Sequence, residues 1–250
     1  MSNIKQKIKN ETTIGTFLSI PSSDITEILS LSGFDWLIID MEHAPISIDK
    51  AQSMIQTISD EVISIMRPTW NDPVLIKQCL DTGAQGLLIP WINNVEDAEN
   101  AIKATKYPPQ GIRGVGPRRA SKYGKKYREY LENANDEIFL ILQIETREAV
   151  ENIDDILKTE GVDLFFIGPA DLSTSMGYRG VVDTPEVVEI IDYLLDKSKE
   201  LGVPAGIYVS DIENAILHIK KGFKFIALSI DYNYLLESTS NAVNNIKSSI

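Results

Sequence analysis

Short apolar runs rich in Ile, Leu, Val and Phe alternate along the chain with longer segments in which apolar residues recur at helical spacing. The short runs are continuously apolar, which is typical of strands that are buried on both faces of a parallel sheet. We therefore predict eight strands, at residues 14–20, 35–40, 62–67, 86–91, 138–145, 162–168, 204–209 and 224–230.

A segment with apolar residues at i, i+3, i+4 and i+7 follows each predicted strand, and several of these segments begin with an Asp or Thr cap and end at Gly. Eight such units in 250 residues predict an α/β fold, a (β/α)8 TIM barrel, as one domain over residues 1–250. An open doubly wound sheet is the alternative. Residues 107–137 are too long for a simple connection and are expected to form an inserted loop and helix with a functional role.

Composition narrows the possible partners. The chain has 36 acidic and 24 basic residues, a net charge of -12, which would repel nucleic acid and anionic membranes. Residues 1–10 lack the apolar core of a signal peptide, and no run approaches the roughly 18 apolar residues of a membrane span, so we expect a cytoplasmic protein. Cys79 is the single cysteine, which excludes a disulfide framework or a thiolate zinc site and predicts a packing role.

Polar residues gather where four of the predicted strands end. Active sites of TIM barrels lie at the carboxyl ends of the strands, so these residues are expected to share one rim. Five residues after the other strands are interpreted as caps or rim residues: Trp91, Asn93, Ser210, Asp211 and Asp231. The candidate site residues are Asp40, Glu42 and His43 after the second strand, Arg67 at the end of the third, Gln143 and Glu145 in the fifth, and Gly168, Pro169, Ala170 and Asp171 after the sixth.

Two acids end neighbouring strands, Glu145 and Asp171. Held close together, they would repel each other unless one is protonated or a cation lies between them. Oxygen ligands without cysteine favour a hard divalent cation such as Mg²⁺ or Mn²⁺, with the remaining coordination positions left to water and substrate. The alternative is structural: Glu145 paired with Arg147, and Asp171 as the N-cap of a short helix.

Arg67 and His43 are the other candidates for chemistry. A guanidinium keeps its proton, so Arg67 is a permanent donor to a carboxylate or an oxyanion, although an ion pair with Asp40 or Glu42 is an alternative that is compatible with this role. His43 is the histidine expected at the rim and could transfer a proton near neutral pH, with a buried structural histidine as the alternative. His218 lies inside a helical segment and is expected to be structural or exposed.

A metal, an arginine and a base suit a reaction in which a 2-oxo acid binds the metal and loses a proton to become an enolate. The cation and Arg67 would stabilise the oxygen on which negative charge develops. An imine-forming aldolase would instead need a lysine pointing into the barrel. Lys224 begins its strand, at the wrong end, and the other lysines fall in helices and loops, so the sequence favours metal over imine chemistry.

Five segments also resemble a known family: GFDWLIIDMEHAP, RPTWNDPVLIKQCLDTGAQGLLIP, YPPQGIRGVGP, LILQIETREAVENIDDIL and GVDLFFIGPADLSTSMGY. They are similar to the metal-dependent (class II) pyruvate aldolases of the HpcH/HpaI type, which include 4-hydroxy-2-oxoheptane-1,7-dioate aldolase and 2-keto-3-deoxy sugar acid aldolases. The resemblance runs from about residue 14 to residue 231. It implies reversible cleavage of a 4-hydroxy-2-oxo acid to pyruvate and an aldehyde.

The resemblance also implies roles for the rim residues. Glu145 and Asp171 would hold the divalent cation, Mg²⁺, Mn²⁺ or Co²⁺. His43, supported by Asp40, would be the acid/base residue, working through a metal-bound water. Pyruvate would be bound by Arg67 on its keto oxygen, by Gln143 nearby, and by the backbone of Gly168, Pro169, Ala170 and Asp171 near its carboxylate.

In the family pattern an acid that matches Asp81 pairs with the histidine, yet Asp81 ends a helical segment and should lie at the opposite face of its own barrel. The resemblance implies hexamers, built as trimers of dimers in which the last helix packs on a partner, so a neighbouring subunit could supply Asp81. The insertion is basic and either caps a neighbour's mouth or forms a solvated surface. Its basic residues are Arg113, Arg118, Arg119, Lys122, Lys125, Lys126 and Arg128.

Other activities remain open at this point. The same enolate would serve an oxaloacetate decarboxylase or a citryl/malyl-CoA-type lyase, and a barrel that binds a metabolite without catalysis is a further alternative. The aldehyde is not identified, since Phe17 and the loop GPRRASKYG differ from the corresponding residues of relatives.

Overall fold

Eight parallel strands close into a barrel in chain order, with β1 paired to β8. The computed structural model describes residues 4–250, with backbone only for residue 9. All eight predicted strands are confirmed, with ends within two residues of the prediction, and the open-sheet alternative is wrong. The strands are β1 Thr13–Leu18, β2 Trp36–Asp40, β3 Ile63–Arg67, β4 Gly86–Ile89, β5 Phe139–Ile144, β6 Leu164–Ile167, β7 Ala205–Val209 and β8 Phe225–Ile230.

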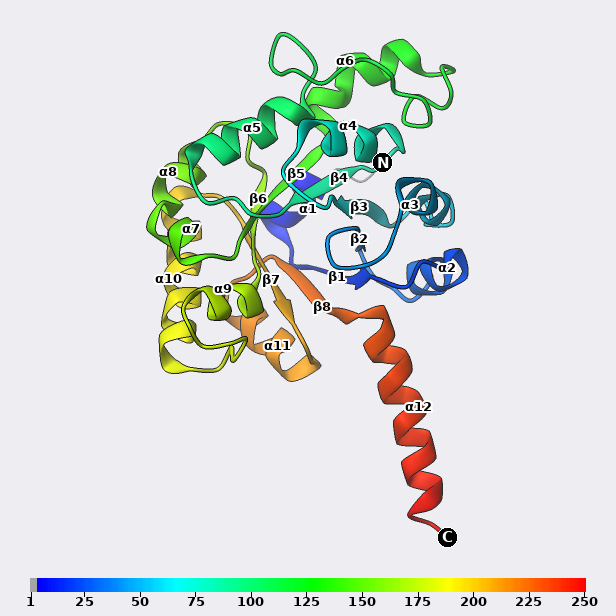
Figure 1. The fold of residues 1–250 in the computed structure, drawn as a ribbon, viewed down its shortest axis with the longest axis vertical. Helices are drawn as coiled ribbons and strands as arrows, with labels where there is room; N and C mark the ends of the chain where they lie inside the picture. Colours follow the sequence, from blue (N-terminus) through cyan, green and yellow to red (C-terminus); the bar gives the residue numbers. More distant parts are fainter. Residues whose placement is uncertain (1–3) are drawn as a thin grey trace.

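Helices surround this barrel on its outside (Figure 1). The predicted helical segments all contain helix, and α6 forms within the insertion. The helices are α1 Ile4–Asn10, α2 Ser23–Ser30, α3 Ile48–Ile55, α4 Pro73–Asp81, α5 Val95–Thr105, α6 Tyr127–Glu137, α7 Arg147–Glu151, α8 Ile153–Lys158, α9 Pro169–Ser175, α10 Pro185–Leu201, α11 Ile212–Lys221 and α12 Asp231–Lys247.

The first helix, α1, is a feature that the apolar pattern did not predict. Ile4 and Ile8 are its buried residues and belong to the apolar cluster inside the barrel, together with Trp36 and Phe225. Since Trp36 and Phe225 begin their strands, α1 covers the amino-terminal end of the barrel. The carboxyl end remains as the open mouth.

Aromatic packing fills this lower part of the barrel. The rings of Trp36 and Phe225 stack with centroids 3.7 Å apart, and Trp36 Nε1 donates a hydrogen bond to Thr13 Oγ1 at 3.1 Å. A Cβ at Gly15 would lie 2.2 Å from the Trp36 ring, so this strand position requires glycine.

The alternation of side chains along each strand decides what reaches the mouth. Successive strand residues point to opposite faces, so every second residue enters the barrel. Continuing this alternation brings Asp40, Arg67, Gln143 and Gly168 into the barrel as its upper layer, with Asp40 and Arg67 as register partners on β2 and β3. The residues below them in the interior cluster are Trp36 and Ile38, Ile63 and Ile65, Phe139 and Ile141, and Leu164 and Phe166.

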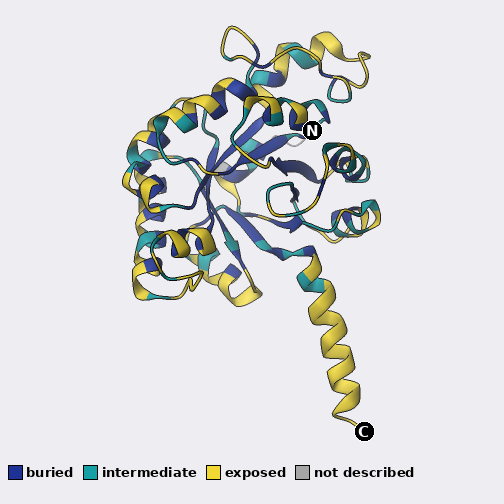
Figure 2. Cartoon of the chain, viewed as in Figure 1, coloured by how far each residue is buried: buried dark blue, intermediate teal, exposed yellow. Residues whose placement is uncertain are grey.

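The last helix, α12, projects away from the barrel (Figure 1), and almost its whole surface is exposed (Figure 2). Its exposed apolar residues lie along one face, since they follow helical spacing. None of the described helices is long and apolar enough to cross a membrane. The residues of this face, called here the α12 stripe, are Tyr232, Leu235, Leu236, Val243 and Ile246.

Cys79 packs in the core on α4, as predicted, with 1% of its surface exposed. Burial raises the pKa of its thiol to about 12, which leaves it unreactive at neutral pH.

Candidate active site

A bidentate ion pair anchors the mouth of the barrel. Arg67 Nε and Nη2 donate to the two carboxylate oxygens of Asp40 at 2.9 and 2.8 Å, and both residues are buried. Asp40 Oδ1 also accepts the backbone N–H groups of Glu42 and His43, at 3.0 and 3.3 Å. Asp40 therefore fixes both the guanidinium and the turn that follows β2.

Glu42 shares the same guanidinium. Its Oε2 lies 3.0 Å from Arg67 Nη1 as an ion pair, without the alignment of a hydrogen bond. Burial raises the pKa of Glu42, and the positive charge of Arg67 counteracts that effect. Burial alone would lower the pKa of Arg67, but its interactions with Asp40, Glu42 and Glu145 outweigh this and raise it, so the arginine stays charged. The ion pair that the sequence offered as an alternative role for Arg67 therefore forms with both Asp40 and Glu42.

Gln143 links the arginine to Glu145. Its Oε1 accepts a hydrogen bond from Arg67 Nη1 at 3.4 Å, and its Nε2 donates to Glu145 Oε2. The other carboxylate oxygen of Glu145 accepts the backbone N–H of Trp91 at 2.9 Å. A continuous set of polar contacts therefore joins the ends of β2, β3 and β5 to Trp91, two residues after β4.

Glu145 has the properties expected of a cation ligand. It is 2% exposed, and burial raises its pKa to about 7, with the charges of Glu42 and Asp171 adding to the increase. A divalent cation would compensate this concentration of carboxylates, so the donor set fits a hard metal ion. The described residues contain no cluster of three or more His, Cys, Asp or Glu side chains suited to a metal.

The structural alternative proposed for these two acids is wrong. Arg147 pairs with Glu151, not with Glu145. Helix α9 begins at Pro169 with Gly168 as its N-cap, so Asp171 lies in the first turn and is exposed, instead of capping the helix.

Gly168 lets Glu145 occupy its position. A Cβ on residue 168 would lie 3.2 Å from both Cβ and Oε2 of Glu145 and 3.3 Å from Gln143 Nε2. The lack of a side chain at this strand end thus leaves room for the Gln143–Glu145 contact. Gly168 and Pro169 are buried, whereas Ala170 is exposed.

His43 stands at the open edge of this cluster. Its side chain is 60% exposed, so the alternative of a buried structural histidine is wrong. The carboxylate beside the imidazole is Glu42, with Oε2 3.7 Å from Nε2. Asp40 reaches the backbone of His43 and positions the turn. An exposed imidazole can exchange protons with solvent and with a substrate in the mouth.

His218 is part of a packed helix surface, in agreement with the structural role expected of it. It is half-buried in α11, and its ring lies edge-on to Phe223 with centroids 5.2 Å apart. Burial lowers the pKa of this imidazole.

Asp81 lies away from this site. It ends α4, whose nine residues run about 13 Å back from the mouth, and Arg113 Nη2 donates to its Oδ1 at 2.8 Å. The expectation that Asp81 occupies the opposite face of its own barrel is confirmed. Arg113 is itself buried between the Tyr107 and Tyr130 rings, so this basic residue of the insertion is structural.

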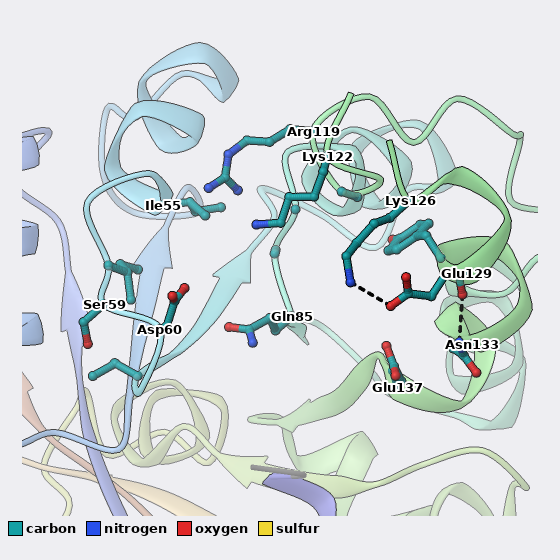
Figure 3. Close-up of a pocket in the computed structure, with 16 residues that line it drawn as sticks. Ile55, Ser59, Asp60, Gln85, Arg119, Lys122, Lys126, Glu129, Asn133 and Glu137 are labelled. Atoms are coloured by element: carbon teal, nitrogen blue, oxygen red, sulfur yellow. Dashed lines mark hydrogen bonds and ion pairs between the residues drawn. The ribbon is translucent and has the colours of Figure 1, made fainter. Parts of the chain in front are cut away.

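A cavity of about 260 Å³ lies at that opposite face, between the insertion and the loops before β3 and β4 (Figure 3). Arg119 and Lys122 point into it, while Lys126 pairs with Glu129 beside them. Its lysines and acids are mostly exposed, and none of the mouth residues lines it. The polar cluster at the mouth is therefore the better candidate for catalysis.

Three aromatic residues at the mouth were not recognised as site residues from the sequence. Trp91, interpreted only as a rim residue, has φ of 57° and holds Glu145 through its backbone N–H. Trp70 packs against it. Phe17 lies under Arg67, with the guanidinium carbon 4.9 Å from the ring centroid. No local pattern marks these residues, because their roles depend on neighbours far away in the chain.

Comparison with known proteins identifies a family that matches most of the chain. The family model described as HpcH/HpaI aldolase/citrate lyase matches residues 13–238. The 4-hydroxy-2-oxo-heptane-1,7-dioate aldolase of Escherichia coli is 44% identical over 225 residues, which are 89% of this chain and 86% of that protein.

Solved structures resemble the whole chain. An HpcH/HpaI aldolase/citrate lyase family protein from Burkholderia cenocepacia J2315 superimposes with a TM-score of 0.95 at 34% identity, covering 99% of this chain and 100% of that one. An HpcH/HpaI aldolase from Desulfitobacterium hafniense DCB-2 gives 0.89 at 30% identity, covering 98% and 96%. The fold, the rim residues and these similarities together show that the chain belongs to the HpcH/HpaI aldolase/citrate lyase family.

Proposed function

We propose that this protein is a divalent-metal-dependent pyruvate aldolase, a carbon–carbon lyase that reversibly cleaves a 4-hydroxy-2-oxo acid to pyruvate and an aldehyde. The observation that carries the proposal is the link from the Arg67 guanidinium through Gln143 to the buried Glu145. This link connects the permanent positive charge of Arg67 to Glu145, a buried carboxylate whose ionised form a divalent cation would stabilise. The aldolase names of the curated relatives favour aldol cleavage over decarboxylation or thioester chemistry.

Pyruvate would bind between the arginine and the start of α9. Arg67 would face the keto oxygen, with Gln143 beside it. The backbone N–H groups of Ala170 and Asp171 lie in the first turn of α9, where a helix has no internal acceptors for them, and they would bind the carboxylate. Gly168 and Pro169 form the wall of this part of the site.

Glu145 and Asp171 would hold Mg²⁺, Mn²⁺ or Co²⁺, which would supply Lewis-acid polarisation of the 2-oxo group. In cleavage, His43 Nε2 accepts the proton of the 4-hydroxyl group as the C3–C4 bond breaks and the aldehyde forms. The electron pair moves onto the pyruvate unit, whose oxygen faces Arg67, and a proton then adds to C3 to give the methyl group. Glu42, 3.7 Å from Nε2, would stabilise the protonated imidazole.

Exchange of the pyruvate methyl protons with deuterium, followed by NMR, tests this proposal without any aldehyde. We expect exchange with Mg²⁺, Mn²⁺ or Co²⁺ and its loss after treatment with a chelator. Exchange that survives complete metal removal, or fails with all three ions, would contradict the mechanism. An aldehyde among the cleavage products separates aldol cleavage from oxaloacetate decarboxylation, which releases pyruvate and carbon dioxide without an aldehyde, and from a lyase that requires a thioester.

The proposal extends to the assembly. We expect residues 1–250 to act as one barrel domain in a cytoplasmic homo-oligomer, a hexamer built as a trimer of dimers with α12 exchanged between subunits. The α12 stripe is apolar and exposed in the single chain, with Leu236 64% and Ile246 65% accessible. A neighbouring subunit would bring its Asp81 to the mouth where His43 lies.

Charging the α12 stripe should break this assembly. The double variant Leu236→Asp/Val243→Asp places two carboxylates on one helix face, and size-exclusion chromatography with light scattering should show a smaller species than the wild type. Asn241→Asp adds a charge on the opposite face of α12 and serves as the matched control. A wild-type monomer with full aldolase activity would contradict both the exchange of α12 and the shared site.

A further inference from the structure

Two tryptophans form an exposed aromatic pair at the mouth of the barrel. Trp70 follows β3 and Trp91 follows β4, and their ring centroids lie 5.6 Å apart with planes at 32°. Trp70 is 51% exposed and Trp91 39% exposed. Large apolar side chains grouped on a surface mark contact sites, and here they adjoin polar catalytic candidates.

Trp91 connects this pair to the candidate active site. Its backbone N–H donates to Glu145 at 2.9 Å, and its side chain lies close enough to Glu42 to counteract slightly the increase in pKa that burial causes there. The φ of Trp91 is positive, a strained conformation for a bulky residue that persists where its surroundings hold it in place. The backbone conformation thus presents the indole at the mouth while the same residue positions Glu145.

Charge decides what kind of molecule suits this surface. Among the described residues, Arg67 is the basic residue that forms ion pairs with the rim carboxylates. Its guanidinium already contacts Asp40, Glu42 and Gln143. A carboxylate on the tail of the aldehyde would meet aromatic faces and the acid Glu42. An uncharged apolar tail would contact the rings without the free-energy cost of removing water from a charged group.

We infer that the Trp70–Trp91 pair, called here the tryptophan shelf, binds the tail of the aldehyde and selects uncharged aromatic or long aliphatic aldehydes. This inference rests on the proposed aldolase function and specifies its second substrate. Trp91 lies beside Glu42, whose carboxylate is 3.7 Å from His43 Nε2, so an aldehyde with its carbonyl near His43 would place its tail over the rings. The preferred aldehyde would then be uncharged, whereas the aldehyde released from a heptane-1,7-dioate substrate would carry a carboxylate on its tail.

Rates of aldol addition to pyruvate with four aldehydes test the shelf in the wild type and in variants. We expect kcat/KM to be higher for benzaldehyde and hexanal than for succinic semialdehyde and acetaldehyde. Trp70→Ala should lower the ratio of kcat/KM for benzaldehyde to that for acetaldehyde by roughly five- to tenfold, the value of one ring contact. Trp70→Phe should restore most of the ratio, since it retains a ring.

A binding measurement keeps the test independent of catalysis. Benzyl alcohol has no carbonyl and cannot react, so its saturation-transfer NMR signal reports contact with the shelf alone. The signal should weaken in Trp70→Ala and persist in Tyr193→Ala, a matched loss of an exposed ring on the outer helix α10. Failure of the aldolase proposal would appear as absent pyruvate exchange in the wild type, whatever benzyl alcohol does.

Two outcomes would overturn the inference. One is an unchanged benzaldehyde-to-acetaldehyde ratio and an unchanged benzyl alcohol signal in a folded Trp70→Ala variant. The other is a change in oligomeric state in that variant with selectivity unchanged, which would assign the rings to contact between copies of this chain.

Discussion

Replacing Arg67 with methionine should reduce metal-dependent exchange of pyruvate methyl protons by about 10³-fold, because a positioned donor to a developing oxyanion contributes rate enhancements of this size. It should also lower the free energy of unfolding by about 3–5 kcal/mol, since Asp40 would remain buried without its bidentate partner. NMR exchange rates and chemical denaturation measure the two effects separately.

The double variant Asp40→Asn/Arg67→Met separates stability from catalysis. Removing the buried carboxylate together with its partner should recover much of the lost stability, yet exchange should stay as slow as in Arg67→Met. Arg67→Lys retains the positive charge but loses the bidentate contact with Asp40. We expect this variant to exchange the pyruvate methyl protons more slowly than the wild type does. Normal exchange in a folded Arg67→Met protein would remove Arg67 from the proposed chemistry.

Replacing Glu145 with glutamine should abolish metal-dependent exchange and also change how stability depends on pH. Burial raises the pKa of Glu145 from 4.5 to about 7, so the folded, metal-free protein binds a proton more tightly than the unfolded chain does. The resulting stabilisation is fully present below about pH 4.5 and is lost as the pH rises through 7. Its size is on the order of 3 kcal/mol.

A divalent cation should oppose this loss, because it binds the ionised carboxylate. In thermal denaturation, Mn²⁺ should therefore raise the midpoint of the wild type more at pH 8 than at pH 5.5. Glu145→Gln should show neither the metal effect nor this part of the pH dependence. Glu148→Gln, an exposed change three residues further on, serves as the control. A metal-induced shift of wild-type size in Glu145→Gln would exclude Glu145 as a ligand.

The positions of the rim residues could be predicted because they follow from local rules. Buried strands are recognisable as continuous apolar runs, and the ends of parallel strands share one rim. Arg67 at the end of β3 and Glu145 directly after β5 therefore came to the mouth as expected. Asp81 was placed on the opposite face by the same reasoning, since a helix after a strand runs back along the barrel.

Which partners these residues bind could not be predicted in the same way. Asp40 and Glu42 were alternative partners of Arg67, yet the guanidinium forms ion pairs with both, and the Glu145–Arg147 pair does not form. The terminal helix α1 closes the barrel through two isolated isoleucines, a pattern too short to indicate a buried helix. Trp91 carried no chemical signal, because its functional group is a backbone N–H.

By itself, the sequence determined the barrel, the rim that holds the candidate site and the residue types on that rim, because buried strands and their ends are recognisable from neighbouring residues. The tertiary structure alone decided the contacts. Arg67 meets Asp40 across 27 residues and Gln143 across 76, and Trp91 meets Glu145 across 54. Closure of the barrel sets these distances, since it brings together strand ends that no local pattern relates.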